Sequence, residues 1–230
     1  MNSLFTPIRL RDLEIRNRVW MPPMCQYHAT DGLPEDWHFV HYGARAAGGY
    51  GLIIAEATGI VPEGRISPAC TGLWNDEQEA AWSRIVSFVH SQGAKMGIQL
   101  NHAGRKASTI PWLPGRGDGS VREGGWETVG PSAVAQEGID PPREMTLEEI
   151  QALPGQFAAA ASRAVRADFD TVELHGAHGY LLHQFLTPLA NHRTDEWGGS
   201  FENRTRFFRA VARAVRGVLP EGMPLLVRLS

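Results

Sequence analysis

The feature that most constrains the fold is a repeated alternation of short apolar runs with longer amphipathic stretches. Residues 51–58 (GLIIAEAT) are almost continuously apolar, which predicts a parallel strand buried on both faces. Residues 75–93 follow, with Asn75 as N-cap, acidic residues in the first turn and apolar residues at helical spacing. Because strand and helix patterns keep alternating along the chain, the sequence predicts an α/β fold.

In all, the pattern predicts five strands and four long helices. The strands are expected at residues 18–24, 51–58, 95–100, 171–174 and 224–229, and the helices at residues 36–47, 75–93, 146–165 and 201–216. Thr146 and Glu149 form a capping box, and Ser200 caps the last helix. Between the third strand and the third helix, residues 106–145 are rich in Gly and Pro and have no sustained period, which is typical of a lid insertion.

Parallel strands joined by helices fit either an open doubly wound sheet or a (β/α)8 TIM barrel. No GxGxxG motif follows a strand and no Walker A motif is present, which disfavours a nucleotide-binding open sheet. We therefore expect a barrel, formed by a single domain over residues 1–230. Because Ser230 follows the fifth strand directly, we expect the barrel to be truncated after strand 5, with roughly three βα units missing.

Composition and charge exclude several classes of function. The apolar runs are far shorter than the ~20 residues that cross a bilayer, and the N-terminus lacks a signal-peptide core, so we expect no membrane partner and a cytoplasmic location. A net charge of −3 without blocks of like charge argues against nucleic acid as a partner. Cys25 and Cys70 lack the spacing of a disulfide scaffold or a zinc ribbon.

Chemically distinctive side chains gather where the strands are expected to end, which is where a parallel barrel builds its active site. They are Met24, Cys25, Gln26 and Tyr27 after the first strand, Glu56, Ala57 and Thr58 at the second, Gln99, Leu100, Asn101 and His102 at the third, His175, His178 and Tyr180 at the fourth, and Arg228 at the fifth. This rim is rich in hydrogen-bond donors and poor in carboxylates. It disfavours hydrolysis by a carboxylate pair and favours a planar, hydrogen-bonding cofactor.

His175 and His178 have three possible roles. A zinc site would need a third ligand at a strand end, and neither an HEXXH motif nor an adjacent acidic residue supplies one, so no metal is expected. A purely structural pair, satisfied by loop backbone, is the second possibility. As twin hydrogen-bond donors the two imidazoles would bind a developing oxyanion on a carbonyl compound, with Tyr180 in reach as a proton donor.

Eight motifs occur in a specific order along the whole chain. They are PPMCQY (22–27), DWHFVHYGARA (36–46), EATGIVPEGRISP (56–68), QLNHAGRKAS (99–108), GWETVGPSA (125–133), REMT (143–146), ELHGAHGYLLHQFLTPLANHRTDEWGGSFENRTRF (173–207) and VRLS (227–230). In this order they resemble the old yellow enzyme family of FMN-dependent ene-reductases, in the thermophilic-like class that includes xenobiotic reductases.

The resemblance implies a bound FMN and names the residues that would surround it. These are Pro22, Pro23, Met24, Cys25, Ala57, Gln99, His175 and Arg228. By the same resemblance, Gln99 would contact the pyrimidine edge and Arg228 would lie near N1 and O2. Cys25 would lie beside the ring and tune its reduction potential.

The resemblance also implies catalytic roles and a reaction. His175 and His178 would hold the carbonyl oxygen of an α,β-unsaturated substrate. Tyr27 would shape the same pocket, and Tyr180 would be the acid. In such enzymes NADPH or NADH gives a hydride to FMN, and the reduced N5 passes it to Cβ of the substrate while a proton reaches Cα. The expected activity is therefore that of an NADPH dehydrogenase of the old yellow enzyme type, with small-molecule enones and related activated alkenes as substrates.

Two departures from the family pattern leave alternatives open. The phosphate-binding loops of the family follow strands seven and eight, which lie outside this sequence, and Trp197 stands where relatives often carry Tyr. One alternative is a non-catalytic or partner-dependent fragment that binds ligand without turnover, exposes two strand edges and holds FMN weakly. Another is a dienoyl-CoA reductase, which would need an iron–sulfur cysteine cluster downstream. A homo-oligomer is left open for the full-length protein.

Overall fold

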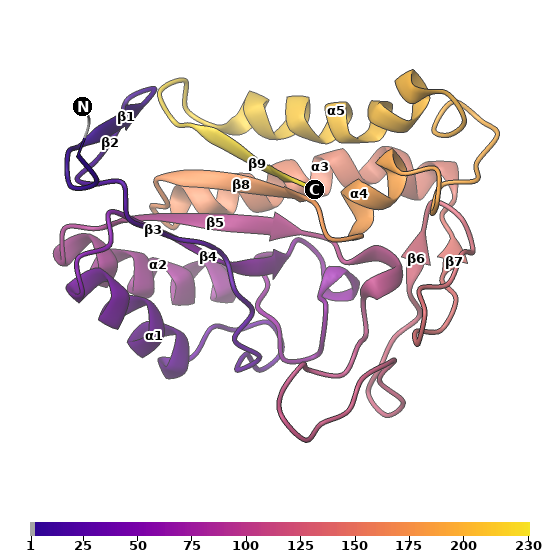
Figure 1. Cartoon of the computed structure of the whole chain (residues 1–230), viewed down its shortest axis with the longest axis horizontal. Helices are drawn as coiled ribbons and strands as arrows, with labels where there is room; N and C mark the ends of the chain where they lie inside the picture. The colour runs from indigo at the N-terminus through magenta and orange to yellow at the C-terminus, as the bar shows by residue number, and fades with distance from the viewer. Residues whose placement is uncertain (1–2) are drawn as a thin grey trace.

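Five parallel strands form the centre of the computed structural model, which describes residues 3–230 (Figure 1). The strands are β3 (Trp20–Met21), β4 (Leu52–Gly59), β5 (Lys95–Asn101), β8 (Thr171–Gly176) and β9 (Leu225–Leu229), hydrogen-bonded in that order. The helices are α1 (Asp36–Ala47), α2 (Asp76–Ser91), α3 (Leu147–Arg166), α4 (Leu181–Leu186) and α5 (Phe201–Val218). The predicted alternation of parallel strands and crossover helices is confirmed.

Four helices form one continuous layer against the sheet, because α1 packs on α2, α2 on α3 and α3 on α5. The main core lies between this layer and the strands. It includes Ile53, Ile98 and Val172 from strands and Trp82, Phe157 and Val211 from helices. Burying each such side chain stabilises the fold by roughly 1.5–3 kcal/mol. No helix within residues 3–230 is both long enough and apolar enough to cross a membrane.

The helix starts follow the capping chemistry predicted from the sequence. Asn75 Oδ1 accepts the N–H of Gln78 at 2.9 Å, and Ser200 likewise caps α5. The N–H of Glu149 donates to Thr146 Oγ1 at 3.2 Å, and the N–H of Thr146 donates to Glu149 Oε2 at 2.8 Å. Each bond satisfies an N–H that the first helical turn leaves without a partner.

The first strand of the sheet is shorter than predicted, which corrects the expected range of residues 18–24. Only Trp20 and Met21 pair with β4, opposite Leu52 and Ile53. The chain leaves the ladder at Pro22 and Pro23 because proline has no N–H to donate to a neighbouring strand. The segment that follows is therefore irregular backbone at the C-terminal end of the strands.

The sequence pattern also missed an N-terminal hairpin, formed by β1 (Ile8–Leu10) and β2 (Leu13–Ile15). Leu13 and Ile15 pack with Leu52 and Ile54 of β4. Neighbouring strand residues point to opposite faces, so Leu52 and Ile54 face away from the helix-covered side, to which Ile53 belongs. The hairpin thus covers the other face of the sheet near the N-terminal ends of the strands.

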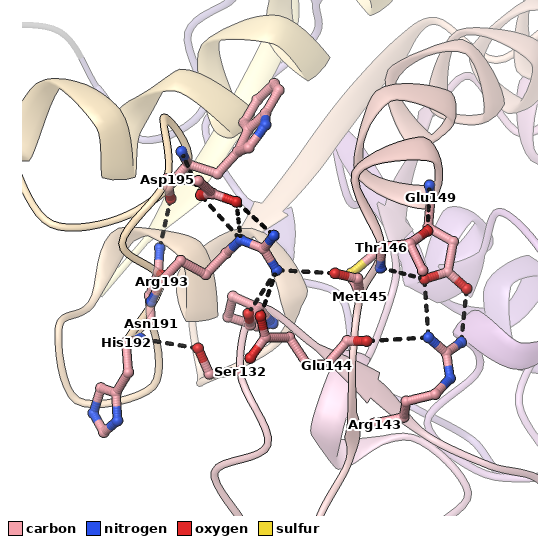
Figure 2. A network of polar contacts seen from close by, with 12 residues as sticks. Ser132, Arg143, Glu144, Met145, Thr146, Glu149, Asn191, His192, Arg193 and Asp195 are labelled. Atoms are coloured by element: carbon pink, nitrogen blue, oxygen red, sulfur yellow. Dashed lines mark hydrogen bonds and ion pairs between the residues drawn. The ribbon is translucent and has the colours of Figure 1, made fainter.

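Arg193 is one of the residues that hold the Gly- and Pro-rich insertion against the rest of the chain. After the 3-10 turn η2 (Gly104–Lys106) the insertion contributes β6 (Val129–Gly130), which pairs with β7 (Arg143–Glu144). Figure 2 shows Arg193, from the loop between α4 and α5, reaching into this region. Its guanidinium donates to the carbonyls of Pro131 and Met145 at 3.1 and 2.9 Å. It also donates to both carboxylate oxygens of Asp195.

Candidate active site

Three of the predicted site residues form an aromatic cluster where β8 ends. The ring centroids of His175 and His178 are 5.0 Å apart with an edge-to-face angle of 79°, and Tyr180 lies 4.8 Å from His175. The chain bends sharply here, since His178 adopts a left-handed φ of 57°. The bend brings the side chains three and five residues after His175 close to the His175 ring.

Burial keeps the two imidazoles neutral at physiological pH. Burial lowers the pKa of His175 to about 3, helped by the neighbouring charges of His178 and Arg228. Burial also lowers the pKa of His178, followed by the charge of Arg228. His175 Nδ1 accepts the N–H of Ala177 at 3.3 Å, so the ring proton is on Nε2 and available for donation.

The Tyr180 hydroxyl keeps its proton at this site, because burial raises its pKa well above 10. Lys106 lies against the same ring, with Nζ 5.3 Å from the ring centre, and donates to the carbonyl of His178 at 2.9 Å. Burial lowers the pKa of Lys106. Sequence analysis missed this lysine because it belongs to the Gly/Pro-rich region, where no periodicity pointed to it.

The segment after β3 places Cys25 and Tyr27 beside the end of β4. Both pack against a small apolar cluster that contains Ala57 and Cys70, and Tyr180 joins it from the other side. The hydrogen bond with the Cys70 thiol, followed by burial, raises the pKa of Cys25 well above its usual value. Cys25 is therefore a thiol rather than a reactive thiolate.

Pro22, Pro23 and Met24 lie beyond the strand end, with Pro22 and Met24 exposed and Pro23 half-buried. They present apolar surface to the same end of the sheet as Cys25. Burial also raises the pKa of Tyr27, so this phenol stays protonated as well.

Gln99, His175 and Arg228 lie on the neighbouring strands β5, β8 and β9. Gln99 is almost fully buried and donates from Nε2 to Glu173 at 2.7 Å. Arg228 is half-buried opposite His175, and its guanidinium has no hydrogen-bond acceptor within residues 3–230. Glu173 adds a second acid to Glu56, which was predicted at these strands, and each carboxylate is held by other groups.

A cavity of about 280 Å³ opens beside the aromatic cluster. Tyr27, Tyr180, Lys106 and Ile66 form its inner wall, and residues of the insertion, among them the exposed Trp112, form the outer wall. His175 and His178 do not line this cavity themselves, but His175 packs against Tyr180, which does. The size is at the lower end of the range for small-molecule sites.

A second cavity, of about 320 Å³, lies between η1 (Pro62–Gly64), the β6–β7 pair and α3. Its charged lining is largely paired internally, because Arg143 bonds both Glu127 and Glu149 at 3.0 and 2.7 Å. Nor do any three His, Cys, Asp or Glu side chains within residues 3–230 form a potential metal site, so the zinc interpretation gains no third ligand. The first cavity is the better candidate.

Comparison with known proteins identifies the family. The model of the NADH:flavin oxidoreductase / NADH oxidase family matches residues 3–230. The chain belongs to this family. An NADH:flavin oxidoreductase of Gibberella zeae is 50% identical over 99% of the chain, and an NADPH dehydrogenase of Clostridium acetobutylicum is 45% identical over 99%.

Solved structures of the flavin oxidoreductase family show the same fold. Morphinone reductase, in complex with tetrahydroNAD, superposes with a TM-score of 0.87 at 36% identity over 100% of the chain, and an old yellow enzyme from Pichia with 0.86 at 35% over 98%. The chain spans 56% to 64% of the lengths of these four proteins. The predicted resemblance, the α/β barrel class and the FMN cofactor with NAD(P)H as reductant are confirmed at the level of the family.

The strand ends of this chain fit an FMN ring. Within residues 3–230 the guanidinium of Arg228 has no hydrogen-bond acceptor, and Gln99 keeps an amide oxygen and one N–H beyond its bond to Glu173. Cys25 and the small Ala57 add an apolar wall. An array of donors beside a flat apolar wall suits a planar ring with carbonyl and N–H edges.

The structure brings most of the predicted site residues together. Cys25, Tyr27, Ala57 and Tyr180 share one cluster, His175 and His178 join it through Tyr180, and Gln99 and Arg228 lie on strands adjacent to that of His175. The role of each residue remains a prediction.

Proposed function

We propose that the protein is an FMN-dependent ene-reductase that reduces the C=C bond of α,β-unsaturated carbonyl compounds with NADPH or NADH. The observation that carries this proposal is the neutral histidine pair beside a protonated tyrosine. FMN, when bound and reduced, supplies the hydride from N5 to Cβ of the substrate.

His175 and His178 bind the carbonyl oxygen of the substrate. His175 donates from Nε2, since Nδ1 is occupied by the Ala177 N–H. Negative charge builds on the carbonyl oxygen as Cβ is reduced, and donors that already point at it stabilise the charge without reorganisation. Because both imidazoles are neutral, they act as hydrogen-bond donors rather than as cations.

Tyr180 delivers the proton to Cα. Its hydroxyl is protonated and mostly enclosed, and its ring packs against His175, so an oxygen held by the histidines lies near the phenol. Tyr27 faces it across the cavity and limits the orientation of the substrate.

The test is whether the protein holds FMN and oxidises NADPH faster when cyclohexenone is supplied, with cyclohexanone as the product detected by gas chromatography. A yellow protein that forms cyclohexanone in step with NADPH loss supports the proposal. A protein that takes up no FMN, or whose NADPH oxidation is unaffected by cyclohexenone, contradicts it.

A further inference from the structure

Glu56 is a fully buried acid within β4, next to Ala57 of the small apolar cluster against which Cys25 and Tyr27 pack. The pairing of β4 with β5 shifts register between Ala55 and Ala57, so Glu56 is the extra residue of a β-bulge. Bulges redirect side chains and are frequent next to active sites. Here the bulge carries a carboxylate into the protein interior.

Donors surround this carboxylate on three sides. Oε2 accepts the backbone N–H of Gln26 at 3.0 Å. Oε1 accepts the hydroxyl of Tyr42 at 3.4 Å, and that hydroxyl itself accepts the N–H of Glu56 at 3.1 Å. His38 Nε2 lies 3.1 Å from Oε1, although its N–H is not aligned as a hydrogen bond.

No cation neutralises Glu56 among residues 3–230. Its only ionisable partner of opposite type is His38, whose Nδ1 accepts the N–H of Glu35 at 3.0 Å. Nδ1 is therefore an acceptor, and the ring proton lies on Nε2, which faces Oε1. Burying a carboxylate without a countercharge costs free energy, so packing of the core does not explain an acid at this position. A role in a functional site does explain it.

What the carboxylate holds is the turn after β3. Gln26, whose N–H it binds, lies between Cys25 and Tyr27. Tyr27 has a left-handed φ of 56°, which is strained for an aromatic residue and persists only when its surroundings fix it. The bond from Gln26 to Glu56 anchors the middle of this turn.

We propose that Glu56 is a positioning residue whose buried carboxylate, through the Gln26 N–H, locks the Cys25–Tyr27 turn as one wall of the flavin site. The link to flavin rests on the proposed function, whereas the locked turn is a property of this chain alone. The negative charge has a second consequence, because it adds to the hydrogen bond from Cys70 and to burial in raising the pKa of Cys25.

The test compares Glu56→Gln with Asp170→Asn. Asp170 is also largely buried, but it precedes β8 at the opposite end of the strands and is paired with His90 and Lys95. The measurement is the rate at which iodoacetamide alkylates each cysteine at pH 7.5, resolved by peptide mass spectrometry and made without flavin. Cys70, which is fully buried, serves as the internal reference.

We expect Glu56→Gln to accelerate alkylation of Cys25 at least tenfold without changing Cys70, and Asp170→Asn to change neither. If Glu56→Gln does not fold, Glu56→Asp keeps the charge but cannot reach the Gln26 N–H, and should show the same selectivity for Cys25. Equal acceleration of both cysteines would reveal general loosening and overturn the proposal, as would an unchanged Cys25 rate.

The flavin link has its own readout, the midpoint potential of bound FMN. Removing a negative charge near the ring should favour the reduced form, and a tenfold tighter binding of reduced over oxidised FMN corresponds to about 30 mV. A raised potential in Glu56→Gln but not in Asp170→Asn supports the assignment, and an unchanged potential overturns it. If the parent protein binds no FMN, the proposed function fails while the alkylation result still decides the role of Glu56.

Discussion

His90 Nε2 lies 2.6 Å from the Asp170 carboxylate, at the end of the strands opposite to the candidate site. Asp170 also accepts from Lys95 Nζ and the N–H of Met96, each at 2.8 Å. The bond to Asp170 raises the pKa of His90. Burial opposes ionisation of Asp170, yet the bonds from His90, Lys95 and Met96 leave its pKa below the usual value. The pair connects the C-terminal end of α2 to β5 and β8.

The first prediction follows from this pair. The folded-state pKa of His90 exceeds its unfolded value of about 6.5, so its stabilisation is fully present below pH ~6.5 and is lost as the pH rises through the folded-state pKa. We expect His90→Gln to lower the free energy of unfolding by about 1 kcal/mol near pH 6 and by less at pH 9, as measured by urea denaturation. A loss that is the same at both pH values would contradict a charged pair.

A second prediction concerns Gln99 and Glu173. The Glu173 carboxylate can only accept hydrogen bonds, so the Gln99 amide turns its NH2 group toward Glu173 and its oxygen away. Glu173→Gln removes this constraint and should weaken FMN binding about tenfold, or about 1.4 kcal/mol, in a fluorescence titration. Glu202→Gln, an exposed change on α5, should leave the affinity unchanged. Equal affinities of the Glu173 variant and its parent would show that the amide needs no such anchor.

Local signals account for the parts of the fold that were predictable. The buried strands β4, β5 and β8 are long enough to show their apolar pattern, and the caps at Asn75 and Thr146 involve residues only three apart. The hairpin was missed, and β3 was predicted too long, because two or three residues carry too little periodicity. Their structure depends on pairing with Leu52 and on packing under the sheet, which are contacts between residues far apart in sequence.

In the candidate site, too, some features were predictable from local sequence and others depended on contacts between distant residues. Strand ends pointed to His175 and Gln99 because a parallel barrel gathers its strand ends whatever the sequence between them. The partner that orients Gln99 was not predictable, since Glu173 looks like one polar residue in an otherwise apolar strand. Glu56 was visible as a strand-end residue, but its inward direction depends on a bulge in the pairing with β5.

The third prediction concerns the hydrogen bonds that Arg193 makes to Pro131, Met145 and Asp195, which Figure 2 shows and which are called the Arg193 clamp below. Arg193→Lys keeps the positive charge, but a single ammonium cannot donate to the Pro131 and Met145 carbonyls and to the Asp195 carboxylate at the same time. We expect a loss of about 2–3 kcal/mol in the free energy of unfolding, because the site is nearly buried. Limited proteolysis should also cleave the chain between residues 106 and 145 faster in the Arg193→Lys variant than in the parent protein.

The matched control for the Arg193 clamp is Arg122→Lys in the same insertion. Arg122 pairs with Asp140 at 2.6 Å, but both side chains are exposed, so the change should alter stability by less than about 0.5 kcal/mol. Similar losses for the two variants would mean that Arg193 acts as an ordinary surface ion pair.

The fourth prediction is a flat pH profile for carbonyl binding. Because the pKa of His175 is about 3, its imidazole should stay neutral from pH 5.5 to 7.5. We expect the Kd of cyclohexanone, a ligand that does not ionise, to remain constant over this range when followed through the visible spectrum of FMN. A transition centred near pH 6.5 would show a histidine that titrates normally.

The most direct test of the account is the rate at which cyclohexenone reoxidises the reduced flavoprotein, followed by stopped-flow absorbance. His178→Ala removes one donor to the carbonyl oxygen, which typically slows such a step by about 10²–10³-fold. His192→Ala, an exposed histidine of the loop before α5, is the control and should react at the parental rate. Slow reoxidation in the His178 variant alone is the predicted result, and reoxidation at the parental rate would contradict the role of the histidine pair.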